Sequence, residues 1–131
     1  MEAAAAAFPA KIRVLIADDH RLFAETLEAL LGTDDRIEVV ATAADGREAV
    51  RLALELAPDV TLMDINMPVL DGFEATRRIR ARNPGACVLV LTGSNARTDV
   101  ARAREAGAAG YVTKDRIAAE LIEAILEVAA R

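Results

Sequence analysis

The chain has 131 residues, the usual size of one compact domain, and 53% of them are hydrophobic, which excludes a disordered chain. Its 21 acidic residues outnumber its 16 basic residues, and this net charge of −5 argues against a nucleic-acid surface. The one cysteine, Cys87, can form no internal disulfide and suits a reducing cytoplasm, and no apolar stretch approaches the roughly 18 residues of a membrane span.

Residues 1–10 lack the basic leader of a signal peptide, and we expect a disordered tail before one folded domain over residues 11–131. Within that domain, five short apolar runs alternate with helical patterns. We predict strands over Ile12–Ala17, Ile37–Ala43, Val60–Met63, Cys87–Leu91 and Gly110–Thr113.

The first helix is predicted from apolar residues at helical spacing between Leu22 and Leu31, with Gly32 ending it. Asp45 and Asp71 each precede a further helix and have a glutamate three residues later, which is the spacing of an acidic capping box. The arginines of the third helix, at positions 77, 78, 80 and 82, are interpreted as a solvated face.

The third helix is expected to stop before Pro84, and a fourth to run over residues 96–106 and stop at Gly107. Apart from Val100, the fourth helix offers mainly alanines for burial, so we expect an element that can shift. A fifth helix carries Leu121 and Ile125. Strand and helix thus alternate throughout, which predicts an α/β fold: a doubly wound five-stranded parallel sheet in the flavodoxin-like order 2-1-3-4-5, a (βα)5 sandwich.

Residues suited to handling a phosphoryl group follow four of these strands: Asp18 and Asp19, Asp64, Thr92 and Lys114. Parallel strands deliver such residues to one edge of the sheet, and the crevice of this strand order lies between the first and third strands. Three carboxylates and one ammonium leave a charge of minus two, which one divalent cation would cancel. Oxygen ligands favour Mg²⁺ or Mn²⁺. Asp64 would attack phosphorus and become an aspartyl phosphate.

Simpler interpretations exist for each residue taken singly. An aspartate after a strand is often only a helix N-cap, and a threonine is common there. His20 follows the acidic pair where a helix begins, and we expect a loop or capping position for it, not a phosphodonor or a metal ligand. The joint pattern of acids, hydroxyl and lysine favours the functional interpretation.

Four segments carry a resemblance to a known family: VLIADDH at 14–20, DVTLMDINMPVLDG at 59–72, VLTGS at 90–94 and AGAAGYVTKD at 106–115. With them the chain resembles, from Lys11 to Arg131, the receiver domain of a two-component response regulator. The acidic pair followed by His20 and an Arg-Leu-Phe helix start is most similar to the NarL/FixJ subfamily, whose regulators carry a LuxR-type helix-turn-helix.

This resemblance implies that Asp64 is the phosphoacceptor and that Asp18 and Asp19 are the acids of the metal site. The metal shell of Mg²⁺ would be completed by Asp64 and by the backbone carbonyl of Asn66. The Asn66 side chain would also flank the path of attacking water and so influence the lifetime of the aspartyl phosphate.

The resemblance further implies that Thr92 is the switch hydroxyl, Lys114 the phosphate-pairing lysine and Tyr111 the switch aromatic. Gly93 would leave the phosphoryl pocket open, and Ser94 would tune the access of water. Lys114 is followed by an aspartate where many receivers have proline, and without that proline a cis bond would cost about 3–4 kcal/mol.

As a receiver, the chain is expected to be a signalling switch that catalyses only its own aspartyl phosphorylation and dephosphorylation. The implied partners are a sensor histidine kinase and, on phosphorylation, a second copy of the chain. We expect a cytoplasmic protein with no membrane partner and no direct nucleic-acid binding. DNA would be bound through a C-terminal domain absent from these residues, unless the chain is a single-domain regulator.

Three rival functions are open at this point. A haloacid-dehalogenase-type phosphatase needs a second acid two residues after its nucleophile, where this chain has Asn66. A flavodoxin needs a phosphate-binding loop after the first strand and aromatic rings around its flavin, but the chain has one Tyr and no Trp. A docking module that works without phosphorylation would not need the intact acceptor, acids and lysine.

Overall fold

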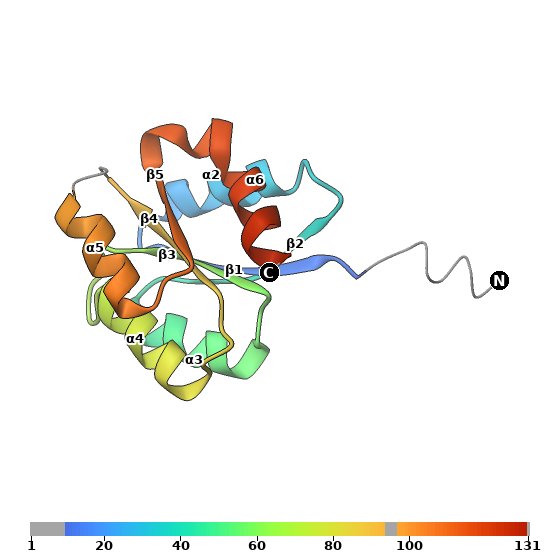
Figure 1. Ribbon diagram of the computed structural model, residues 1–131. Helices are drawn as coiled ribbons and strands as arrows, with labels where there is room; N and C mark the ends of the chain where they lie inside the picture. The colour runs from blue at the N-terminus through green and yellow to red at the C-terminus, as the bar shows by residue number, and fades with distance from the viewer. Residues whose placement is uncertain (1–9, 94–96, 131) are drawn as a thin grey trace.

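All five strands pair in parallel, in the order β2-β1-β3-β4-β5 (Figure 1), so the predicted fold class and strand order are confirmed. This is a computed structural model, and it describes residues 10–93 and 97–130. The strands are β1 (Ile12–Ala17), β2 (Ile37–Ala43), β3 (Val60–Asp64), β4 (Val88–Thr92) and β5 (Gly110–Thr113).

Helices cover both faces of the sheet (Figure 1). On one face α2 (Arg21–Leu31) and α6 (Ile117–Ala129) pack in one hydrophobic cluster, and on the other α3 (Gly46–Leu56), α4 (Gly72–Arg82) and α5 (Arg97–Ala106) share a second. A 3₁₀ turn, η1 (Lys114–Arg116), joins β5 to α6. β3 and β4 are buried along their whole length, which explains their nearly continuous apolar sequences. None of these helices combines the length and the apolar character needed to cross a bilayer.

The strand limits agree with prediction for β1, β2 and β5 and differ by one residue at β3 and β4. Asp64 and Thr92 are the last residues of their strands, not the first residues beyond them. The cause is the pairing, because Asp64 lies opposite Leu91 and Thr92 opposite Thr113 in the parallel registers. The backbone of both residues is therefore held by strand pairing.

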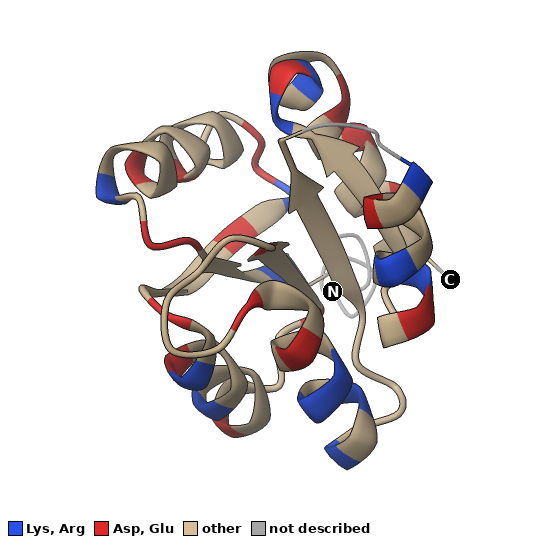
Figure 2. Cartoon of the chain, turned by 90° about the vertical axis from the view of Figure 1, so that its left-hand side faces the viewer, with Lys and Arg blue, Asp and Glu red and all other residues tan. Residues whose placement is uncertain are grey.

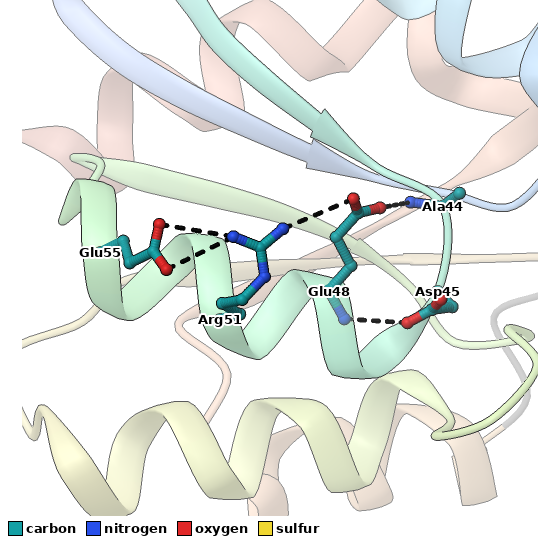
Figure 3. Close-up of polar contacts among 5 residues, drawn as sticks. All are labelled: Ala44, Asp45, Glu48, Arg51 and Glu55. Carbon is teal, nitrogen blue, oxygen red and sulfur yellow. Dashed lines mark hydrogen bonds and ion pairs between the residues drawn. The ribbon is translucent and has the colours of Figure 1, made fainter.

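A nearly complete capping box starts α3 (Figure 3). The backbone N–H of Glu48 donates to the carboxylate of Asp45 at 2.8 Å, and the carboxylate of Glu48 accepts from the N–H of Ala44, also at 2.8 Å. Arg51 pairs with Glu48 and Glu55 on the same exposed surface. These contacts confirm the structural interpretation of Asp45.

The second predicted box, at the start of α4, is only half formed. Asp71 accepts from the backbone N–H of Glu74 at 2.9 Å, but the Glu74 carboxylate pairs with Arg77 and Arg78, each at 3.2 Å. Three and four residues along a helix are adjacent positions, so these arginines compete successfully for the glutamate.

The prediction of a fully solvated arginine face on α4 is wrong for Arg80. Its guanidinium is partly buried and donates to the backbone carbonyls of Pro84 and Ala86. Its side chain also lies against Gly107, where an added Cβ would be 3.0 Å from Nε. Arg80 thus ties the end of α4 to the turn after α5.

The loop between β3 and α4 approaches other backbone too closely for side chains at two glycines. A Cβ on Gly72 would lie 2.2 Å from the carbonyl oxygen of Asp64, and one on Gly46 would lie 1.9 Å from that of Leu70. The Gly72 N–H also donates to the carbonyl of Ile65 at 3.0 Å. This close packing holds the backbone around Asp64 in place.

We therefore expect Gly72→Ala to lower the free energy of unfolding by about 3 kcal/mol or more, because backbone must move to admit the methyl group. Gly85→Ala is the matched control, since an added Cβ there meets its nearest atom at 3.5 Å. Urea unfolding followed by circular dichroism measures both. Equal stability of the two variants would contradict the close approach.

Candidate functional site

Two buried carboxylates lie at the carboxyl edge of the central strands. Asp18 follows β1 and is 3% exposed, and Asp64 ends β3 and is 0% exposed. The backbone N–H of Asp18 donates to the carbonyl of Ala43 at 3.0 Å, which extends the β1–β2 pairing by one residue. The side chains meet in the crevice between β1 and β3, where the strand order reverses, as predicted.

The start of α2 adds two more polar groups to this edge. The N–H of His20 donates to Asp18 Oδ1 at 2.8 Å, and this turn brings the imidazole within 3.3 Å of Asp19 Oδ1. Possible ligand atoms of Asp18, Asp19, His20 and Asp64 all lie within 4.8 Å of one another. His20 holds the N-cap position, as expected, but its side chain makes no capping hydrogen bond and faces the acids instead.

Lys114 enters from η1 and provides an ammonium beside both buried acids. Its Nζ is 3.0 Å from Asp64 Oδ1 and 3.8 Å from Asp18 Oδ2. It also lies over the ring of Phe23, 4.8 Å from the centroid. The bond from Lys114 to Asp115 is trans, since no described peptide bond is cis.

The acids hold more negative charge than Lys114 balances. Asp18 Oδ2 and both oxygens of Asp64 are buried, and within the described residues their main charged partner is Lys114, with only a weak further contribution from the backbone N–H of Asn66 to Asp64. Burial raises the pKa of Asp64, and the ammonium of Lys114 opposes this rise, while the charge of Asp18 adds to it. Figure 2 looks at this edge of the sheet and shows Asp and Glu at several turns around the strand ends. The arrangement suits a divalent cation with oxygen ligands.

The remaining predicted site residues differ in how deeply they are buried. Thr92 is fully buried at the end of β4, and Gly93 has open space where a Cβ would stand. Asn66 is exposed in the loop after β3, and its backbone N–H partly offsets the raised pKa of Asp64. Tyr111 points outward on β5 and is 41% exposed. Ser94 lies outside the described residues.

Phe23 is the site residue that sequence reasoning missed. Its helical spacing marked it as a core residue, and it does pack against the cluster under α2 and α6. The contact with Lys114 joins residues 91 positions apart in the sequence. The only available signal was an aromatic residue in the first turn of the helix after the acidic pair.

The charge imbalance makes the stability of the protein depend on pH. The folded pKa of Asp64 lies above its ordinary value of 3.8, so without divalent cations folding stability falls as pH rises through that range. Asp64→Asn removes the ionisable group and with it this loss of folding stability. We expect the variant to exceed wild type by about 1–3 kcal/mol at pH 7, with the difference shrinking toward pH 4.

Thermal unfolding in a chelator measures this difference, and Asp35→Asn makes the same charge change at an exposed residue. If Asp64→Asn were less stable than wild type at pH 7, the excess of negative charge at the buried acids would be contradicted.

The model of the response regulator receiver domain matches residues 14–126 of this chain. Among curated proteins, the transcriptional regulatory protein DegU of Brevibacillus brevis is 44% identical over 119 residues, covering 91% of this chain and 50% of DegU. A protein-glutamate methylesterase/protein-glutamine glutaminase of Carboxydothermus hydrogenoformans is 48% identical over 106 residues, 79% of this chain and 30% of that protein. The chain spans about half or less of the length of these relatives.

Solved structures give the same result. The receiver domain of the response regulator NarL from Mycobacterium tuberculosis superposes with a TM-score of 0.89 at 34% identity, covering 93% of this chain and 98% of that one. The family model, the relatives and the solved structures all point to the same family. The chain belongs to the response regulator receiver domain family and is most similar to its NarL/LuxR branch.

Proposed function

We propose that Asp64 accepts a phosphoryl group from a sensor histidine kinase and that the surface of the domain changes in response. The observation that carries the proposal is the buried pair Asp18 and Asp64, with Lys114 Nζ 3.0 Å from the Asp64 carboxylate. Burial of two adjacent carboxylates is costly for folding, so their retention at this edge favours a chemical task.

The unbalanced oxygens fit Mg²⁺, with Mn²⁺ as a second candidate. Asp18, Asp19, Asp64 and the backbone carbonyl of Asn66 would hold the ion. When bound, the cation would neutralise charge on the acids and on the incoming phosphoryl oxygens.

The protein's own groups account for the rest of the transfer. A carboxylate oxygen of Asp64 forms a bond to phosphorus as the P–N bond of the donor phosphohistidine breaks, and the departing nitrogen keeps the electron pair and takes a proton. Lys114 moves from the Asp64 carboxylate to a phosphoryl oxygen, and Thr92 donates a hydrogen bond to another. A Cβ added at Gly93 would meet no atom within 4 Å, so this glycine would leave room for the group, and Asn66 and Ser94 would influence hydrolysis by water.

Output is proposed through a domain outside these residues. DegU is a transcriptional regulatory protein and the methylesterase is an enzyme, so similar receivers serve different outputs. The similarity to the NarL/LuxR branch favours transcription, with DNA bound by another domain and the whole protein acting in the cytoplasm.

The first test is incubation with Mg²⁺ and phosphoramidate, followed by intact mass spectrometry. We expect wild type to gain one phosphoryl group, and Asp64→Asn or wild type with excess chelator to gain none, because the acceptor or the charge balance is missing. A folded wild-type chain that gains nothing would favour a docking module that works without phosphorylation.

The proposed switch uses Thr92 and Tyr111. A phosphoryl group that draws in Thr92 would let Tyr111 rotate inward and reshape the surface formed by α5, β5 and α6. α5 suits such a change because, among its described contacts with the core, only Ala103 and Ala106 are buried. Phosphorylation shifts the population only by its difference in interaction energy between the two states.

Tyr111→Ala is therefore expected to accept phosphate like wild type but to lose at least most of the phosphorylation-dependent change in assembly state. Sedimentation velocity with and without phosphoramidate measures that change, and Tyr111→Phe, which keeps the ring, is the control. Normal phosphorylation-dependent assembly of the alanine variant would refute the role of Tyr111.

A further inference from the structure

The ammonium of Lys114 has an aromatic contact in addition to its two carboxylates. Its Nζ lies 4.8 Å from the ring centroid of Phe23, a cation–π distance, and 3.0 and 3.8 Å from carboxylate oxygens of Asp64 and Asp18. The lysine side chain is 26% exposed, so the contact is partly shielded from water. Phe23 comes from α2 and Lys114 from η1, so the contact joins two elements at the site.

The ring is a different kind of partner from the carboxylates. Asp64 must release the ammonium when its oxygen bonds to phosphorus, whereas the ring face carries no net charge and takes no part in that bond. A lysine has a flexible four-carbon stem and a strongly hydrated head, so without a second contact it can move toward solvent. Phe23 can hold the head near the acids while its anionic partner changes.

We propose that Phe23 is a positioning residue that keeps the ammonium of Lys114 beside the phosphoryl acceptor. The inference rests on the proposed function for its effect on phosphoryl transfer, but the placement of the lysine can be tested without it. The experiment must distinguish this positioning role from a purely structural one, because Phe23 also packs against the hydrophobic cluster under α2.

Two substitutions separate the effect of the aromatic ring on Lys114 from the effect of apolar packing. Phe23→Leu keeps an apolar side chain and removes the ring face, and Phe23→Tyr keeps the ring face. Leu22→Ala is the control, since Leu22 is the preceding residue of the same helix and is 79% exposed. Thermal unfolding identifies any variant that fails to fold.

The first measurement is the proton NMR shift of the Lys114 ε-methylene group in the unphosphorylated protein. We expect ring-current displacement to higher field in wild type, Phe23→Tyr and Leu22→Ala, and its loss in Phe23→Leu. The second is the phosphorylation rate with Mg²⁺ and phosphoramidate. Phe23→Leu should be roughly three- to tenfold slower than wild type, and the other two should retain the wild-type rate.

The outcomes are distinct. An ε-methylene shift that does not change in Phe23→Leu would overturn the placement of the lysine. A lost shift with an unchanged rate, or equal slowing in the Leu and Tyr variants, would overturn the positioning role. A wild-type chain that takes up no phosphoryl group contradicts the proposed function, while the shift still decides whether Phe23 holds the ammonium.

Discussion

Two buried carboxylates, Asp18 and Asp64, share the ammonium of Lys114, and the packing around them has to hold these three charges together. Asp18 and Asp64 are positioned by strand pairing, and the Asp64 backbone is packed against Gly72 so closely that a methyl group has no room. Such burial is unfavourable by itself, and Lys114 offsets only part of it. The scaffold is tightly packed where this charge is held.

The helix α5, which belongs to the proposed switch surface, buries few side chains. α5 buries only two alanines among its described residues, and a further contact comes from Arg102, which lies 4.2 Å from the ring centroid of Phe73 on α4. Phe73 directly follows Gly72, so α5 is connected through Arg102 and Phe73 to the backbone that packs on Asp64. In the proposed switch, these contacts would connect a charge change at Asp64 to the surface that includes α5.

The sequence was sufficient for the order of the strands and for the acids and lysine, because both follow from local patterns. Apolar runs identified the strands, and polar residues at their ends identified the edge that holds Asp64 and Lys114. The shift of β4 by one residue depends on register with its neighbours, which no local pattern records. The burial of Arg80 and the Phe23 contact were missed because they join residues that the fold alone brings together.

We infer that the buried carboxylates require the positive charge of one divalent cation. Thermal unfolding during a Mg²⁺ titration at constant ionic strength, in wild type and in Asp64→Asn, tests it most directly. We expect the Tm of wild type to rise with Mg²⁺ concentration, since an ion that binds the folded state stabilises it, and the Tm of the variant to rise much less. An equal rise in both proteins, or no rise in wild type, would contradict it.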